Sequence, residues 1–333
     1  MLLSRFPRVR LAHLPTPLEF LPRLTAHLGG PKVYVKRDDC TGLGTGGNKT
    51  RKLEFLMADA VNHNATVIIT QGAVQSNHAR QTAAAACKLG MRSELVFEKR
   101  VTDATDSYMH SGNVFLDHMF GANIREVEKG SDMDAEMEKV AEELRAAGET
   151  PYIIPGGGSN PIGALGYVGC TLEIIEQANE QGVVFDRIVH ATGSAGTQAG
   201  LLVGAKASNS GIPVLGIGVN APRDVQEEKV FKLAVETAEF VGAPGIIQRE
   251  DVVANCDYVG DGYGVPTKGM NDAVLLLARL EGLLFDPVYS GKGLAGMLDL
   301  IAKGEIGADE TIVFVHTGGS AALFAYHDRL EVA

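Results

Sequence analysis

Short β-rich segments alternate with longer amphipathic segments along almost the whole chain, and this order constrains the possible folds more than any other feature. The expected strands cover residues 33–36, 66–70, 93–97, 123–127, 151–154, 187–190, 214–219 and 311–316. The expected helices cover residues 49–61, 76–89, 113–119, 132–147, 163–177, 196–207, 225–241, 266–281 and 291–303. Strands separated by helices indicate an α/β protein with mostly parallel sheets.

Glycine is unusually frequent and is concentrated in loops. It provides 40 of the 333 residues, whereas an average protein contains roughly 7%. The glycines gather in four patches, at residues 42–49, 155–166, 191–200 and 316–322. Because glycine has no side chain, backbone N–H groups in such loops can approach a ligand closely. Two patches follow expected strands, and ligands of open α/β sheets bind at the carboxyl ends of strands. The patches therefore predict an anionic small molecule held by loops.

The charge balance and the hydropathy restrict the partners. With 30 Lys and Arg against 41 Asp and Glu, the net charge is −11, which disfavours nucleic acid and membrane surfaces as main partners. No apolar run reaches the roughly 18 residues of a membrane-spanning helix. Arg and Pro interrupt the N-terminal segment before a signal-peptide core forms, so we expect a cytoplasmic protein. Its length suggests roughly two domains. The four cysteines, which lack the spacing of metal ligands and predict no metal site, are Cys40, Cys87, Cys170 and Cys256.

Lys49 follows two glycines and an asparagine at the start of an expected helix. The helix dipole opposes a positive charge at this end and lowers the affinity of the amine for a proton. A lysine that forms an imine needs such a lowered affinity. An ordinary exposed lysine in a first helical turn fits the same pattern, so Lys49 alone leaves both interpretations open.

Two further loops open helices with polar side chains. The Ser76 hydroxyl, the Asn77 amide and the free N–H groups of the next helix would hold a carboxylate. Ser194 and Thr197 belong to a loop whose N–H groups would form a phosphate cup. That loop matches neither GxxxxGK[ST] nor GxGxxG, which weakens a nucleotide interpretation. An ordinary helix cap and a tight strand–helix turn remain open alternatives.

Six segments carry a resemblance in combination: KRDDCTGLGTGGNKTRKLEF, GAVQSNHARQTAAAA, GSAGT, GYGVP, LEGLLFDPVYSGK and HTGG. With them the chain resembles, nearly end to end, the D-cysteine desulfhydrase and 1-aminocyclopropane-1-carboxylate deaminase group of pyridoxal-phosphate (PLP) enzymes. The resemblance implies the tryptophan-synthase-β architecture (fold type II). This is an α/β fold with two open, twisted, mostly parallel sheets flanked by helices and the cofactor between two domains. It also implies a small domain at residues 48–160, a large domain formed by residues 1–47 and 161–333, and a homodimer.

The resemblance assigns roles to residues that match the motifs of the group. Lys49 would bind the cofactor aldehyde as an imine and later move the Cα proton, and Tyr289 would stack on the pyridine ring. Asn77 would hydrogen-bond the phenolic oxygen, and Lys52 would contact the phosphate. The other implied cofactor-binding residues are Ser194, Ala195, Gly196, Thr197 and Thr317. A small amino-acid substrate would meet Thr45, Gln75, Ser76, Asn77, His78, Ser159 and Tyr263. The implied catalytic set is Lys49, Ser76, Tyr263 and Tyr289.

Two positions separate the chemistries inside the group. The deaminase has an acidic residue after its DPVY tyrosine and a leucine in its H-x-G-G motif, where this chain has Ser290 and Thr317. A carboxylate keeps the pyridine nitrogen protonated and the ring a strong electron sink, whereas a hydroxyl leaves it closer to neutral. Opening a cyclopropane needs the strong sink, but thiolate and sulfite leave without it. We therefore predict β-elimination at a C–S bond.

The sulfur substrate is less constrained. L-cysteate, which would give pyruvate, sulfite and ammonia, is the first choice. Its sulfonate needs hydroxyl or N–H donors, which the side chains of Thr41, Thr45, Ser159 and Asn160 carry, and these segments look like the sulfo-lyase branch. D-cysteine, which would give sulfide, is the alternative, and the cyclopropane amino acid is less expected. Alternatives from other classes are an amino-acid-binding protein on the same scaffold and a nucleotide-dependent dehydrogenase, whose glycine fingerprint is absent.

Overall fold

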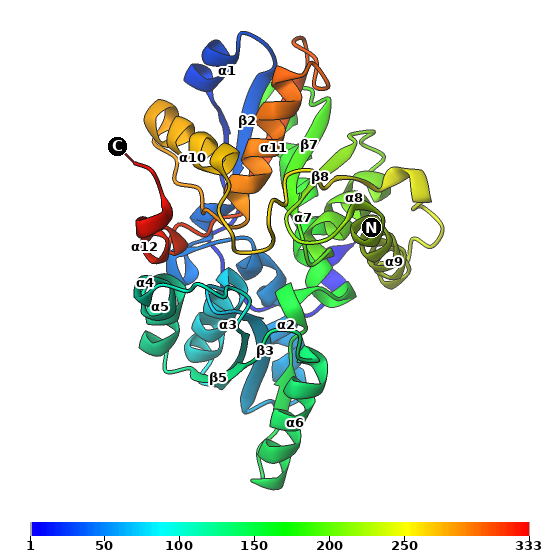
Figure 1. Cartoon of the computed structure of the whole chain (residues 1–333). Helices are drawn as coiled ribbons and strands as arrows, with labels where there is room; N and C mark the ends of the chain where they lie inside the picture. Colours follow the sequence, from blue (N-terminus) through cyan, green and yellow to red (C-terminus); the bar gives the residue numbers. More distant parts are fainter. Residues whose placement is uncertain (1, 333) are drawn as a thin grey trace.

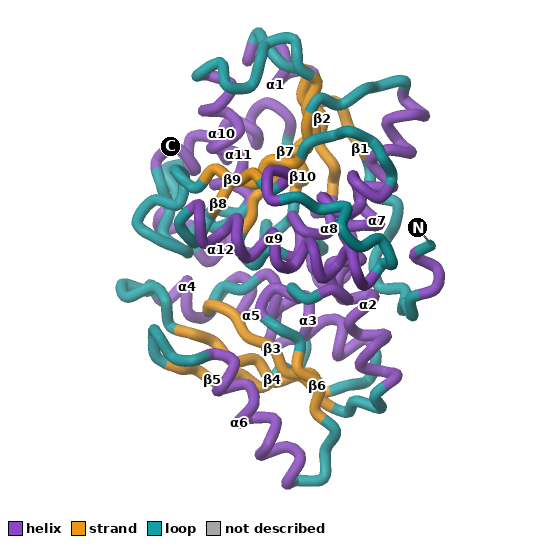
Figure 2. The backbone as a smooth tube through the Cα atoms, turned by 90° about the vertical axis from the view of Figure 1, so that its right-hand side faces the viewer, coloured by secondary structure: helices purple, strands orange, loops and turns teal. Residues whose placement is uncertain are grey.

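The computed structural model describes residues 2–332 and contains two β-sheets in separate halves of the molecule (Figures 1 and 2). The large sheet has the strand order β1-β2-β10-β7-β8-β9, and the small sheet has the order β5-β4-β3-β6. The large sheet consists of β1 (Leu18–Phe20), β2 (Lys32–Arg37), β7 (Arg187–Thr192), β8 (Val214–Gly218), β9 (Val253–Asn255) and β10 (Thr311–His316). The small sheet consists of β3 (Val67–Ala73), β4 (Arg92–Glu98), β5 (Asn123–Val127) and β6 (Pro151–Ile153). Neighbouring strands are parallel, except that β1 is antiparallel to β2.

Helices surround both sheets (Figure 1). Those of the first half of the chain are α1 (Pro22–Leu28), α2 (Lys49–Asn62), α3 (Asn77–Lys88), α4 (Asp106–His110), α5 (Gly112–Met119) and α6 (Met133–Ala146). Those of the second half are α7 (Pro161–Gln181), α8 (Gly196–Ala207), α9 (Arg223–Phe240), α10 (Lys268–Glu281), α11 (Ser290–Ala302) and α12 (Ala322–Ala325). Among the described residues, no helix combines the length and the apolar character needed to cross a membrane.

The α/β prediction with mostly parallel sheets is confirmed, and the expected segments have the predicted types. The sequence pattern does not predict β1 and β9, because strands of three residues are too short to show an alternation. All strands of the small sheet lie inside residues 48–160, and all strands of the large sheet lie outside this range. The domain boundaries themselves stay a prediction.

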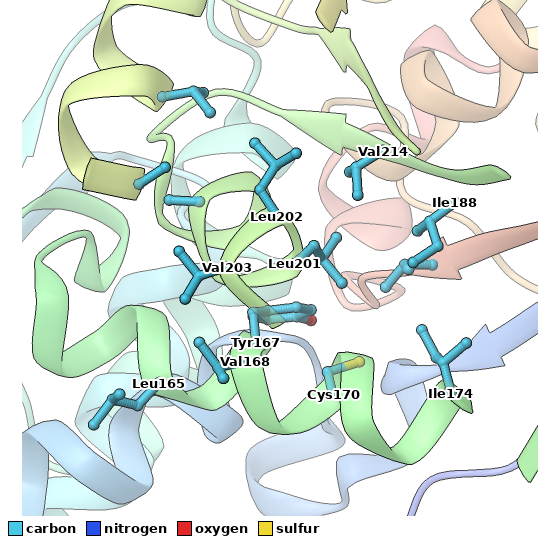
Figure 3. Packing of buried hydrophobic residues seen from close by; sticks show 14 of the residues in the cluster. Leu165, Tyr167, Val168, Cys170, Ile174, Ile188, Leu201, Leu202, Val203 and Val214 are labelled. Atoms are coloured by element: carbon cyan, nitrogen blue, oxygen red, sulfur yellow. The ribbon is translucent and has the colours of Figure 1, made fainter. Parts of the chain in front are cut away.

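The core of the large sheet is built by close contact between helices (Figure 3). Ile188 of β7 and Leu201 of α8 are fully buried in one apolar cluster with residues of α7. A Cβ atom at Gly200 would lie 2.3 Å from the carbonyl oxygen of Ala164. Glycine at this position therefore allows the backbone of α8 to approach the backbone of α7 closely. Helices cover both faces of the parallel strands, so both faces are buried and the strand sequences are runs of apolar residues.

Arg51 connects the two halves of the chain. This residue of α2 donates to both carboxylate oxygens of Asp38, which follows β2, at 2.8 Å each, and to Glu173 of α7 at 2.8 and 2.9 Å. Tyr167 donates its hydroxyl to Asp38 at 2.6 Å. Burial alone would raise the pKa of Asp38, but the Arg51 charge holds that pKa below its usual value. The network therefore fixes the first turn of α2, where Lys49 lies, against the large sheet.

A second buried polar cluster lies where α3 packs against α5. Arg80 of α3 donates to the Thr45 hydroxyl and to the Gly46 carbonyl, whereas neither carboxylate oxygen of Asp117 has a partner among residues 2–332. Burial raises the pKa of Asp117 to about 8, and the charge of Arg80 opposes this shift. The Asp117 carboxyl therefore keeps its proton in the folded protein at neutral pH.

The raised pKa predicts how stability changes with pH. The unfolded chain loses the Asp117 proton near its ordinary pKa, and the folded chain keeps it until about pH 8, so this group lowers stability as the pH rises through that window. The slope for one proton is at most about 1.4 kcal/mol per pH unit. Asp117→Asn removes this dependence, so the free energy of unfolding of the variant should rise relative to the wild type from about pH 5 to about pH 8. Urea unfolding across this range measures the difference, and parallel curves would contradict the prediction.

Candidate active site

A cavity of about 370 Å³ opens between the two sheets. Sites for small molecules commonly measure roughly 300–1,000 Å³. The strands β3, β7 and β10 end at this cavity, and α2 and α3 begin there, as the glycine patches predict. Its lining includes Asn48, Lys49, Ser76, Asn77, His78, Gly157, Ser159, Gly193, Ser194, Tyr263, Tyr289 and Thr317.

Lys49 is the first residue of α2 and is only 7% exposed, so its interpretation as an exposed lysine is wrong. Its Nζ atom lies 5.7 Å from the centre of the Tyr289 ring. Burial lowers the pKa of Lys49 to about 8, and a contact with Lys52 partly opposes this shift. The direction is the one expected from the helix dipole, but the main cause is loss of water. The lowered pKa leaves a larger fraction of neutral, nucleophilic amine near neutral pH.

The loop after β7 closes the cavity as a cup. Ala195 has a φ of 74°, and the turn brings the N-terminus of α8, at Gly196, to the cavity wall. Ser159 donates its hydroxyl to Ser194 Oγ at 3.0 Å and accepts the Gly196 N–H at 3.1 Å. A Cβ atom at Gly196 would lie 2.8 Å from Ser159 Oγ and 3.0 Å from Lys52 Nζ, so a side chain there would fill the cup. A helix N-terminus beside an ammonium group is a donor set for phosphate.

Lys52 supplies the ammonium group of this cup. It is buried, and its Nζ donates to the Gly157 carbonyl at 3.0 Å. Burial and the charge of Lys49 both lower the pKa of Lys52. An anion bound beside the two amines would stabilise the protonated form of Lys52, because an opposite charge favours the charged form.

The N-terminus of α3 forms another wall of the cavity. The Ser76 hydroxyl accepts the Ala79 N–H at 3.1 Å, so Ser76 is an ordinary helix cap and also lines the cavity. The next residue, Asn77, uses its amide oxygen to accept from Asn113 Nδ2 at 3.0 Å. Both residues therefore present polar groups where a carboxylate could meet the N–H groups of the helix.

His78 follows on the same wall. Its Nε2 lies 2.9 Å from the Thr70 hydroxyl, which donates to the Ile154 carbonyl, so His78 is the donor to Thr70. Burial lowers the pKa of His78 well below its usual value, and the positive charges of the two active-site lysines add to the shift. The ring is therefore neutral.

Thr317, rather than Ser290, offers its hydroxyl to the cavity. The Ser290 hydroxyl donates to Asp286 Oδ2 at 2.5 Å and accepts the Asp286 N–H at 2.9 Å, and Ser290 does not line the cavity. Thr317 lines the cavity, and its buried hydroxyl has no partner within the described part of the chain. Asp286 also accepts the N–H of Tyr289 at 2.7 Å, which orients the ring that faces Lys49.

The structure does not bring all predicted site residues into the cavity. Gln75 lies behind the wall, where it donates to the carbonyls of Tyr108 and Ser111 at 2.6 and 2.9 Å and accepts the Asn113 N–H at 2.9 Å. Thr45 is exposed elsewhere and accepts from Arg80, so direct substrate contact by Gln75 or Thr45 is not supported. In the cup, Ala195, Gly196 and Thr197 contribute backbone rather than lining side chains, and the Thr197 hydroxyl accepts from Asn48 at 3.2 Å.

Sequence reasoning missed the charged residues that line the cavity further out, namely Arg100, Asp134 and Lys229. Arg100 lies 5.4 Å from the centre of the Tyr263 ring and pairs with Glu98 at 2.5 Å. These residues stand outside the four glycine patches. No local signal in the sequence marks them, because only the packing of distant elements brings them together.

The cavity combines a buried lysine of lowered pKa with a set of N–H and ammonium donors suited to phosphate. This combination is typical of α/β enzymes in which a lysine amine bonds to a phosphorylated ligand. Comparison with protein families agrees, since the model described as "Pyridoxal-phosphate dependent enzyme" matches residues 9–318. The chain belongs to this family and is a PLP-dependent enzyme, as the sequence predicted.

Individual relatives narrow the resemblance. The chain is 45% identical over 328 residues to the D-cysteine desulfhydrases of Salmonella typhi and Salmonella newport, covering 98% of this chain and 98% of each relative. A solved structure described as an ACC deaminase homologue is 41% identical, with a TM-score of 0.88 over 98% of this chain and 96% of that one. An O-ureido-L-serine synthase structure, 18% identical with a TM-score of 0.66 over 97% of this chain and 95% of that one, shares the fold. The predicted family and fold type II architecture are confirmed, as is an enzyme homologous to carbon–sulfur lyases.

The residues of the cavity fit pyridoxal phosphate. The cup at Ser194 and Lys52 suits its phosphate, Lys49 suits its aldehyde, and the unpaired Thr317 hydroxyl suits a ring nitrogen that needs a neutral partner. The roles of the individual residues remain predictions of the resemblance.

A substitution of Gln75 tests whether its buried hydrogen bonds stabilise the wall of the cavity. Gln75→Leu leaves the Tyr108 and Ser111 carbonyls and the Asn113 N–H without their buried partner, and an unsatisfied buried group costs about 1–3 kcal/mol. We therefore expect the free energy of unfolding to fall by about 2–4 kcal/mol. The matched control is Gln71→Leu, whose bond to Asp134 is exposed and whose loss should change stability by less than about 0.5 kcal/mol. Urea unfolding measures both, and equal effects would contradict the role of Gln75.

Proposed function

We propose that the protein is a β-eliminating carbon–sulfur lyase that converts D-cysteine and water to pyruvate, hydrogen sulfide and ammonia. Relatives of 45% identity that carry the name D-cysteine desulfhydrase support this substrate better than L-cysteate, the first choice from sequence. The observation that carries the reaction type is the buried Thr317 hydroxyl, which lines the cavity and has no partner among the described residues, in a chain with Ser290 where the deaminase has an acidic residue. A homodimer stays a prediction.

The chain's own residues supply binding and proton transfer. When bound, the cofactor contributes an aldehyde that bonds to amines and a ring that withdraws electrons from the bonds at the substrate Cα. The N-terminus of α3, with the Ser76 hydroxyl, holds the substrate carboxylate. Lys49 Nζ, with its pKa near 8, removes the proton from the substrate Cα, because a base of this pKa is effective near neutral pH.

Two tyrosines complete the proposed site. Burial raises the pKa of Tyr263 and of Tyr289, so both phenols keep their protons. Tyr263 lines the cavity and can donate a hydrogen bond to the departing sulfur. Tyr289 faces the amine of Lys49 with its ring.

Sulfide release tests the proposal. The purified holoenzyme should release sulfide and pyruvate from D-cysteine with a higher kcat/KM than for L-cysteine, L-cysteate or 1-aminocyclopropane-1-carboxylate. Lys49→Ala should lower kcat by at least about 100-fold, the contribution of a positioned base, and should abolish the absorbance that borohydride bleaches. Lys303→Ala, a change of an exposed lysine on the C-terminal end of α11, is the control and should leave both unchanged. Unimpaired turnover by Lys49→Ala would refute the mechanism.

L-cysteate remains a second candidate because the outer cavity is cationic. Arg100 and Lys229 line it, and a sulfonate would gain from their charge. The donors expected from sequence are otherwise engaged: Thr41 donates to the Gly47 carbonyl, Thr45 accepts from Arg80, and Asn160 caps α7. Ser159 alone of that set lines the cavity.

A substitution of Arg100 distinguishes the two candidate substrates experimentally. Arg100→Gln should lower kcat/KM for L-cysteate by at least about tenfold, equivalent to about 1.4 kcal/mol, and should alter the value for D-cysteine much less. Arg125→Gln, on β5 away from the cavity, is the matched control. Parallel sulfite and sulfide assays measure both reactions. Equal losses for the two substrates would exclude an anion contact by Arg100.

A further inference from the structure

Asn113 joins the start of α5 to the cavity wall without reaching the cavity. Its side chain is fully buried, and Nδ2 donates to Asn77 Oδ1 at 3.0 Å. Its backbone N–H donates to Gln75 Oε1 at 2.9 Å. Gly112, with a φ of 58°, makes this approach possible, because a Cβ atom there would lie 2.8 Å from both Gln75 Oε1 and the Ala321 carbonyl oxygen. The start of α5 therefore contacts both Gln75, in the loop before α3, and Asn77, the first residue of α3.

The bond from Asn113 determines which end of the Asn77 amide meets the cavity. With Oδ1 engaged by Asn113, the amide nitrogen is the free end, and Asn77 lines the cavity. That nitrogen lies against the backbone of Gly319, where a Cβ atom would come within 2.5 Å of it. Gln81 donates to the Asn77 carbonyl at 2.8 Å and holds the main chain in place. Asn77 thus offers a donor to a ligand.

We propose that Asn113 is a positioning residue, which keeps the Asn77 amide turned so that its N–H faces the phenolic oxygen of the bound cofactor. The inference rests on the proposed function through the cofactor contact of Asn77, which the family resemblance implies. Asn113 touches neither the cavity nor a ligand, and acts through Asn77 alone. An N–H donor at an oxygen favours its anionic form, whereas an amide carbonyl there would disfavour it.

The Asn113 side chain makes one hydrogen bond among the described residues, the one that Nδ2 donates to Asn77 Oδ1. Its own Oδ1 and both carboxyl oxygens of Asp117, which lies four residues later on the same helix, have no partner among those residues. Asn77 is therefore the group through which the Asn113 side chain can act on the cavity.

Asn113→Asp tests the proposal with almost no change in size. Once its carboxyl is ionised, an aspartate cannot donate to Asn77 Oδ1, so the Asn77 amide should turn its nitrogen to residue 113 and its carbonyl to the cofactor. We expect the midpoint of the pH titration of the holoenzyme's visible absorbance to rise by about one pH unit or more. Asn113→Leu, which adds no charge, should shift the midpoint in the same direction by less. In an Asn77→Ala background Asn113→Leu should add no further shift, because the mediator is gone.

The control and the opposing outcome are specific. Asn271→Asp alters a buried amide on α10 whose partners are the backbone groups of Glu331, and it should leave the titration unchanged. A purely structural role of Asn113 would lower the melting temperature and leave the midpoint in place, which overturns the proposal. Midpoints equal to the wild type in both Asn113 variants, or a shift by Asn113→Leu that persists in Asn77→Ala, also overturn it. The titration needs bound cofactor but no turnover, so a failure of D-cysteine as substrate is seen separately in the sulfide assay.

Discussion

The buried ion pair between Arg51 and Asp38 is the interaction on which the active site depends. Arg51 is on α2, two residues after Lys49, and Asp38 directly follows a strand of the large sheet. The planar guanidinium binds the carboxylate with two hydrogen bonds, a geometry that fixes orientation as well as distance. Gly166 of α7 lets the helix backbones touch, since a Cβ atom there would lie 2.5 Å from the Arg51 carbonyl oxygen. These contacts therefore hold the helix that carries Lys49 in one orientation against the large sheet.

Burial of Lys49 at the start of this helix lowers the pKa of its amine. Packing removes water from Lys49, and its amine loses proton affinity although a contact with Lys52 partly opposes this shift. The same packing brings the N-termini of α2, α3 and α8 to one cavity, because parallel strands end at the same edge of a sheet. A chain with a net charge of −11 thus builds a locally positive site from helix ends and two lysines.

How much of this is predictable from sequence depends on the range of the interactions. Lys49 and Ser194 lie in glycine patches, and Ser76 begins an expected helix after an expected strand, so short-range rules find them, and the alternation of segments predicts the parallel sheets. Arg100 lies in no glycine patch, and its place over Tyr263 results from packing between distant segments. The direction of the Gln75 side chain is not predictable from its neighbours, because a polar residue next to Ser76 can turn either way.

Ser290 shows why motif position does not determine chemistry. The family pattern points to this residue as the partner of the cofactor ring, yet Asp286 already holds its hydroxyl within the first turn of α11. Asp286 also fixes the main chain at Tyr289, so one carboxylate aligns the ring that faces Lys49 and withdraws the nearby hydroxyl from the cavity. The hydroxyl left for a ligand is that of Thr317, on a different segment. A neutral hydroxyl cannot hold a ring nitrogen protonated as a carboxylate does, so the electron sink stays weak. Under the proposed function, a weak electron sink would favour substrates whose β-substituent leaves readily, as the sulfur of cysteine does.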